Sequence, residues 1–149
     1  TVTSTLGDKD NDGDYDEIYS FGARSFSVWS GVNGALIYDC GSELEEKASL
    51  SGFYDDGRSD NKGVEPEGIA IASIGKKKFA FFGLERADAL AIYDVSNAVK
   101  PIFSQMLKTG DAPEGVLFIS KGESPTRRSL LIVSSESDGL VKIYSPSGF

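Results

Sequence analysis

Short apolar runs separated by polar turns recur along the chain, and two long stretches repeat the same order of runs. Residues 65–94 read EPEGIAIASIGKKKFAFFGLERADALAIYD, and residues 112–145 read APEGVLFISKGESPTRRSLLIVSSESDGLVKIYS. Pro-Glu-Gly starts both copies, at Pro66 and Pro113, and Ile-Tyr lies near the end of both. A repeat of roughly 40–50 residues made of short strands is typical of β-propeller blades. The pattern therefore predicts an all-β chain built from blades.

The apolar runs predict three strands in a first unit, four in a second and three in a third. They are expected near residues 18–21, 26–29 and 35–38, then 68–73, 79–84, 89–93 and 102–106, and finally 115–119, 130–134 and 140–144. Asn33-Gly34 is typical of a hairpin turn, because both residues adopt left-handed conformations. Residues 43–51 fit either a helical turn or a fourth strand. Residues 53–64 are polar and predict a loop.

This strand count gives about two and a half blades, whereas a closed propeller has about four to eight. We place the blades at residues 8–52, 65–108 and 112–149 of a single region, 1–149. Isolated blades leave sheet edges and faces bare, which favours association. We therefore expect a partial propeller whose remaining blades come from the same precursor or from other chains. A structural subunit of a ring or fibre is an alternative.

The amino-acid composition shows that the chain is acidic. The 149 residues include 15 Lys and Arg against 23 Asp and Glu, which gives a net charge of −8. Such a surface disfavours nucleic acids and favours cations, and no apolar run approaches the roughly 18 residues of a membrane span. The absence of histidine removes the usual general base and the commonest transition-metal ligand. Cys40 is the only cysteine, so it is either a buried thiol or half of an intermolecular disulfide.

A dense acidic motif, GDKDNDGDYD, lies near the start of the chain. Its carboxylates come from Asp8, Asp10, Asp12 and Asp16, and Asp14 can add its backbone carbonyl. Hard oxygen ligands of this number suit Ca²⁺, and without a cation the crowded carboxylates repel one another. Because the following residues are strand-like, the loop resembles the calcium hairpins of integrin α-subunit propellers more than an EF-hand. The alternative is a solvated acidic turn.

Four glutamates occupy matched positions in the two copies: Glu67, Glu85, Glu114 and Glu136. The first of each pair lies where the innermost strand begins, and the second lies where the next strand ends. Because innermost strands line the channel of a propeller, we expect all four at its mouth. They form a possible axial cation site, since crowded carboxylates need a counter-charge. Alternatively, each pairs with an arginine or a backbone amide within its own blade.

Three cations near these glutamates, Arg58, Lys62 and Arg86, are candidates for anion binding. Beside a carboxylate-bound metal they fit phosphate-ester hydrolysis, because cations stabilise the transferred charge. The alternative is a set of solvent-facing salt bridges. Neither a nucleophile elbow nor a Walker loop is present. If the chain is an enzyme, its catalytic residues are therefore unknown. The sequence favours a non-catalytic module over a metal-dependent phosphoric ester hydrolase.

Four segments together resemble the C-terminal part of the choice-of-anchor I domain: GDKDNDGDYDEIYSFGARSFSVWS, RSDNKGVEPEGIAI, FAFFGLERADALAIYDV and GDAPEGVLFIS. That family includes mesenchyme-specific cell-surface glycoproteins of biomineralising animals and secreted bacterial proteins, some labelled alkaline-phosphatase-like. The resemblance implies a secreted, calcium-associated β-propeller that acts in binding, adhesion or an extracellular biomineral matrix. An alkaline-phosphatase-like subunit is the alternative. Cys40 and Val64 depart from the family pattern, where serine and proline are expected.

Overall fold

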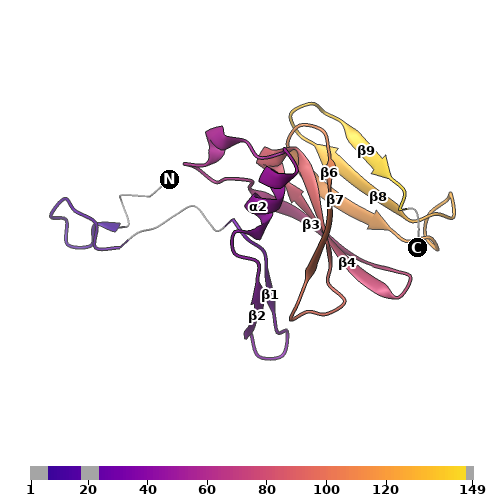
Figure 1. The fold of residues 1–149 in the computed structure, drawn as a ribbon, viewed down its shortest axis with the longest axis horizontal. Coiled ribbons are helices and arrows are strands. Elements are labelled where there is room, and N and C mark those ends of the chain that lie inside the picture. Colours follow the sequence, from indigo (N-terminus) through magenta and orange to yellow (C-terminus); the bar gives the residue numbers. More distant parts are fainter. Residues whose placement is uncertain (1–6, 18–23, 147–149) are drawn as a thin grey trace.

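The computed structural model describes residues 7–17 and 24–146 of the chain. Within these ranges, nine strands form three antiparallel sheets with little helix (Figure 1). The all-β prediction is confirmed, and the sheets of the described ranges do not close into a ring. The strand predicted at residues 18–21 lies outside the described residues.

Each sheet is a meander of antiparallel neighbours. The first sheet pairs β1 (Ser27–Trp29) with β2 (Leu36–Asp39). The second sheet has the order β3 (Pro66–Ile74), β4 (Lys77–Leu84), β5 (Ala89–Asp94) and β6 (Ile102–Lys108). The third sheet has the order β7 (Pro113–Ile119), β8 (Leu130–Ser135) and β9 (Val141–Tyr144). The helical segments are α2 (Glu43–Leu50), η1 (Asp56–Arg58) and η2 (Glu85–Ala87).

Helix α2 settles the alternative that the sequence left open after β2. Three glutamates fill its first turn and Lys47 lies in its last turn, so both charges suit the helix dipole. Leu44 and Ala48 lie one turn apart and are fully buried. The helix therefore packs one apolar stripe on the body of the protein, while Glu46, Ser49 and Leu50 are exposed.

The face of the second sheet that is turned toward α2 forms the first half of the core. Phe26 stacks on Phe82, with 4.2 Å between the ring centroids, and meets Tyr93 edge-on at 4.9 Å. Leu44 of α2 joins the same cluster. These aromatic side chains are therefore core residues. Trp29 of β1, by contrast, is 59% exposed.

The opposite face of the second sheet packs on the third sheet and forms the second half of the core. Phe81 stacks on Phe118, with 6.1 Å between the centroids. Leu90 contributes from β5, and Leu131 and Val133 contribute from β8. Because both faces of β4 and β5 are covered, these strands are continuous apolar runs rather than alternating ones.

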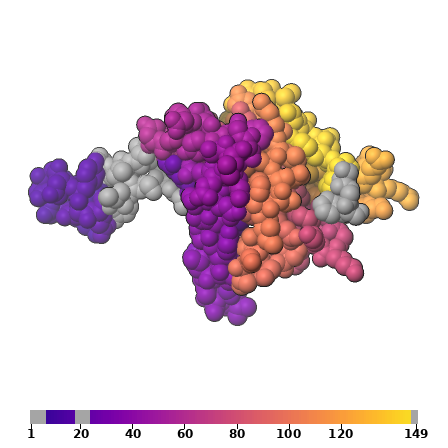
Figure 2. All heavy atoms as spheres, in the orientation of Figure 1, coloured from indigo at the N-terminus to yellow at the C-terminus, as the bar shows by residue number. Residues whose placement is uncertain are grey.

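Two apolar faces stay exposed in the part of the chain that the structure describes. Ile69 and Ile71 of β3 are 55% and 64% exposed on the side facing the first sheet and α2. Leu117, Val141 and Ile143 are 57% to 62% exposed on the outer face of the third sheet. In Figure 2 the purple β1–β2 hairpin also projects below the other sheets. The sheets therefore form a stack with an uncovered apolar surface at each side.

Candidate functional site

The two Pro-Glu-Gly segments have the same backbone geometry, which explains their recurrence. The residue before each proline is left-handed, with φ of 53° at Glu65 and 55° at Ala112. A register irregularity follows each proline, as in a β-bulge. The amide of Glu85 donates to the carbonyl of Glu65 at 3.0 Å, and the amide of Glu136 donates to that of Ala112 at 2.8 Å. Each copy thus fixes the end of its second strand beside the start of its first.

Glycine brings the two copies together at this point. A methyl group at Gly68 would overlap the backbone oxygen of Glu114, and one at Gly83 would lie 3.3 Å from the backbone oxygen of Pro113. Strand β7 therefore crosses β3 and β4 at close range where their side chains are smallest. Strands β3 and β7 begin at their prolines, two residues earlier than predicted. Glu67 and Glu114 are consequently strand residues held next to each other.

Five glutamates meet at this junction, and we call them the glutamate cluster. Two groups of three each place one oxygen per residue within 4.8 Å of one another: Glu65, Glu67 and Glu85, and then Glu85, Glu114 and Glu136. The structure thus brings together all four glutamates that the sequence selected. It adds Glu65, which sequence reasoning missed. The available signal was the difference between EPEG in the first copy and APEG in the second.

Glu65 is the buried anchor of the cluster, at 5% exposure. Its carboxylate accepts a hydrogen bond from Arg86 Nε at 2.9 Å, pairs with Lys62, and lies 3.8 Å from a terminal guanidinium nitrogen of Arg58. Burial opposes ionisation, but the hydrogen bonds from Lys62 and Arg86 outweigh it and lower the pKa of Glu65. The three cations predicted to bind anions are therefore directed at this carboxylate, and anion binding by them stays a prediction.

The other glutamates are less well compensated. Burial, reinforced by the charge of Glu65, raises the pKa of Glu85 although Arg86 lies 2.8 Å away. The charge of Glu67 raises the pKa of Glu114, with burial and Glu136 adding to the shift. In the second copy, Ala112 and a serine replace the Glu65–Arg86 pair of the first copy. Negative charge therefore concentrates on the side of the junction formed by β7 and β8.

This electrostatic arrangement suits a divalent cation. The cluster combines five carboxylates with three cations, so two negative charges remain without a counter-charge. Oxygens within 4.8 Å of one another match a Ca²⁺ shell with metal–oxygen distances of about 2.3–2.6 Å. Glu114 and Glu136 are exposed, which leaves their oxygens accessible from solvent. Metal binding at the predicted axial site stays a prediction.

The acidic loop, residues 7–17, has its own carboxylate group. Asp8, Asp10 and Asp16 each place an oxygen within 4.8 Å of the others. Asp8 accepts hydrogen bonds from the amides of Asp12 and Gly13, at 3.2 and 3.1 Å. These bonds draw the loop around the first carboxylate, as the alternating aspartate pattern predicts.

Two aspartates of the motif have different roles from the three that converge. The side chain of Asp12 accepts a hydrogen bond from the amide of Asp14 at 3.1 Å. Neither residue belongs to the group that lies within 4.8 Å. Gly13 has φ of 100°, a conformation that other residues rarely adopt, and it allows the chain to reverse there. The loop therefore presents three close carboxylates, and ligation by Asp12 and Asp14 stays a prediction.

Cys40 lies inside the first half of the core. Its side chain is buried, and its sulfur lies 3.2 Å from the backbone nitrogen of Phe26, which donates a hydrogen bond to it. Burial raises the pKa of the thiol. Both properties oppose thiolate chemistry. Within the described part of the chain, Cys40 is a buried thiol, and an intermolecular disulfide through it stays a prediction that requires local opening.

The fold and these clusters define a β-sheet repeat protein with carboxylates gathered where the first strands of its second and third sheets, β3 and β7, begin. The chain belongs to the choice-of-anchor I domain family, whose sequence model matches residues 1–98. This match confirms the resemblance seen in the sequence motifs. Within the described residues, the structure contains no helix long and apolar enough to cross a membrane.

Two curated proteins are similar to the chain. Gigasin-3a of Magallana gigas is 30% identical over an alignment that covers 97% of the chain and 63% of that protein. The mesenchyme-specific cell surface glycoprotein of Strongylocentrotus purpuratus is 24% identical over 70% of the chain and 17% of that protein. The chain thus spans less than two thirds of the length of either relative. No solved structure matches it.

Proposed function

We propose that the chain is part of a secreted, calcium-binding β-propeller that acts in binding or adhesion in an extracellular matrix. Family membership supports the general assignment, and one relative is named for the cell surface. The observation that carries the calcium assignment is the convergence of Asp8, Asp10 and Asp16 within 4.8 Å in a loop of alternating aspartates. Carboxylate oxygens grouped in this way are the ligands that Ca²⁺ prefers.

The arrangement of the sheets supports the propeller. The second and third sheets pack face to face, and their first strands, β3 and β7, lie side by side. Such stacking around a shared inner edge is how propeller blades are arranged. The exposed faces at Ile69–Ile71 and at Leu117 would then be covered by further blades. Because both relatives are longer than this chain, we propose that these blades belong to the same polypeptide.

A binding role is proposed in preference to phosphate-ester hydrolysis. Arg58, Lys62 and Arg86 are directed at Glu65, so their charge is already used to stabilise a buried carboxylate. A transferred phosphoryl group needs cations that are free to follow its charge. The glutamate cluster is proposed instead as a second cation site, whose role is to hold neighbouring blades together.

Calorimetric titration of Ca²⁺ into the chain tests the proposal. The chain is expected to bind Ca²⁺ at micromolar to millimolar concentrations, in the range of extracellular modules. Asp10→Asn removes one charged ligand of the loop and should weaken that binding at least tenfold. Asp111→Asn, at an exposed aspartate between β6 and β7, is the matched control and should change the affinity less than twofold. A chain that takes up no Ca²⁺ at millimolar concentration would overturn the proposal.

A further inference from the structure

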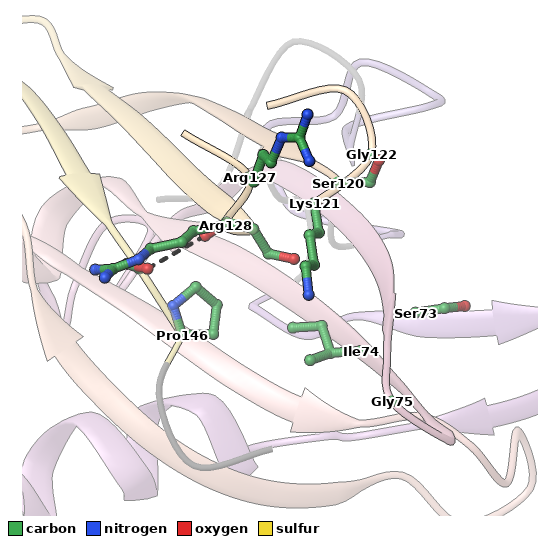
Figure 3. A pocket seen from close by; sticks show the side chains of 11 residues that line it. Ser73, Ile74, Gly75, Ser120, Lys121, Gly122, Arg127, Arg128 and Pro146 are labelled. Atoms are coloured by element: carbon green, nitrogen blue, oxygen red, sulfur yellow. Dashed lines mark hydrogen bonds between the residues drawn. The ribbon is translucent and has the colours of Figure 1, made fainter. Parts of the chain in front are cut away.

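The end of the sheets opposite the glutamate cluster holds a cavity of about 720 Å³. Strands β3 and β7 both start at the cluster and end at this cavity, which lies between the β3–β4 turn and the β7–β8 loop. Figure 3 shows Ile74 and Gly75 on the first of these and Lys121, Arg127 and Arg128 on the second. The Lys121 amine is directed across the hollow toward Ile74. We call this space the basic cavity.

Lys121, Arg127 and Arg128 all line the basic cavity, and in Figure 3 their charged groups point in different directions around it. Among the described residues, none of these three forms an ion pair, unlike Arg24, Lys62 or Arg86, which lie against glutamates. The charge of these three residues is available to a ligand.

The β7–β8 loop also contains one carboxylate, that of Glu123, which opposes the positive charge of the basic cavity. Glu123 accepts a hydrogen bond from the Ser120 hydroxyl at 2.7 Å and another from the Ser120 amide at 3.3 Å. It therefore closes the loop on itself and does not neutralise a particular lysine or arginine. Counting Glu123 against the three cations of the basic cavity still leaves an excess of positive charge. An anion is the ligand that this charge favours.

The β7–β8 loop is held in shape before any ligand arrives. The amide of Ser124 donates to the carbonyl of Ser120 at 2.9 Å, and the amide of Arg127 donates to that of Ser124 at 3.0 Å. Arg127 itself is left-handed, with φ of 55°, so these contacts hold a conformation that an arginine does not favour alone. A loop that is already ordered loses less conformational entropy on binding.

We propose that the basic cavity binds the sulfate groups of an acidic polysaccharide. Guanidinium groups bind tetrahedral oxyanions through paired hydrogen bonds, and the serines that line the wall, including Ser73 and Ser129, supply hydroxyl donors. The cavity lies open between two turns, which suits a polymer rather than an enclosed small molecule. The choice of a polysaccharide rests on the extracellular location in the proposed function. The acidic far end repels the polymer and so directs it to this end.

Binding of chondroitin sulfate, measured by calorimetry in the presence of a calcium chelator, tests the proposal. The double variant Lys121→Ala/Arg128→Ala should weaken binding at least tenfold. The matched control Lys100→Ala/Lys108→Ala removes the same number of charges from exposed lysines outside the cavity lining and should weaken binding less than threefold. Unsulfated chondroitin should bind at least tenfold more weakly than the sulfated polymer. Added salt should weaken the sulfated complex, because exposed charges are screened.

Three results would overturn the proposal. An equal loss in both double variants would show a general effect of net charge. Equal binding of unsulfated chondroitin would show that sulfate is not recognised. Binding of a casein phosphopeptide in place of chondroitin sulfate, with the same loss in Lys121→Ala/Arg128→Ala, would assign the cavity to a phosphorylated protein. Because the measurement is made without calcium, its failure is separate from a failure of the calcium titration.

Discussion

The acidic loop and the glutamate cluster both gather carboxylates, but they do so by opposite means. The loop takes its three close aspartates from within nine residues of sequence, Asp8–Asp16, and these side chains are largely in water. The cluster takes its glutamates from positions 65 to 136 and from two sheets. The cluster also contains three cations, Arg58, Lys62 and Arg86, directed at Glu65. In the loop, the lysine Lys9 pairs with Glu17.

The difference separates two ways of tolerating repulsion between carboxylates. In the loop, Lys9 is paired with Glu17, so we expect a bound cation to neutralise the three converging aspartates and the order of the loop to depend on it. In the cluster, the fold supplies its own cations around Glu65, and the remaining charge at Glu114 is left for a metal. The first site is therefore a local motif, whereas the second is a product of sheet packing. The following predictions test this division.

Removing the charge of Glu65 should cause the largest loss in the free energy of unfolding. Glu65→Gln leaves three partly exposed cations around a neutral, buried amide, and the loss of these half-buried ion pairs should cost about 2–3 kcal/mol of unfolding free energy. Urea denaturation with calcium chelated measures this loss. Glu67→Gln removes the same charge from an exposed neighbour and should change the stability by less than about 0.5 kcal/mol. Equal effects of the two variants would contradict the internal compensation argued for Glu65.

Separating the two sheets should break the cluster and spare the loop. Gly68→Ala places a methyl group against the backbone of Glu114, and overpacking of this kind costs about 2 kcal/mol. The control is Gly122→Ala, because a methyl group there would have its nearest neighbour at 3.9 Å. Calcium binding that is sensitive to Asp10→Asn should persist in Gly68→Ala. Loss of that binding would show that the two sites are not independent.

Calcium should stabilise the glutamate cluster by a smaller amount. At a calcium concentration ten times the dissociation constant of a site, binding contributes about 1.4 kcal/mol of stability. Thermal unfolding of Asp10→Asn, in which the loop is weakened, should still show such a gain. The double variant Asp10→Asn/Glu114→Gln should lose most of it. If the gain in stability is unchanged in the double variant, the glutamate cluster is not a cation site.

The smallest effect should appear in the pH dependence of stability with calcium chelated. Neighbouring Glu67 raises the pKa of Glu114 above 4.5, so the folded state binds this proton more tightly than the unfolded state does. The contribution of Glu114 to stability is therefore present below pH 4.5 and is lost as the pH rises through its folded pKa. Glu114→Gln should be more stable than the parent chain at pH 7, and the difference should shrink toward pH 4.5. Parallel urea-stability curves would contradict the repulsion.

The sequence predicted features that depend on near neighbours, and it missed features that depend on distant ones. The continuous apolar run of β4 and the aspartate spacing of the loop are local, and both were recognised. Helix α2 remained ambiguous because only Leu44 and Ala48 mark its apolar stripe. Glu65 was missed because Arg86 reaches it only when η2 folds back against the start of β3. The choice of converging aspartates in the loop could not be predicted either, because it depends on hydrogen bonds from backbone amides to the carboxylates of Asp8 and Asp12.

The glycine of the Pro-Glu-Gly segment bears on how a further repeat could pack on the third sheet. Gly68 is covered by the backbone of Glu114 in the following copy, whereas Gly115, its counterpart, is exposed on the outer side of the third sheet. A further copy packed on that side would bring its own glutamate to Gly115, as β7 brings Glu114 to Gly68. Each repeat would then carry the attachment point for its successor, and the unit would be extensible. Lengthening the protein by one repeat would enlarge the scaffold and add a glutamate to the cluster in the same step.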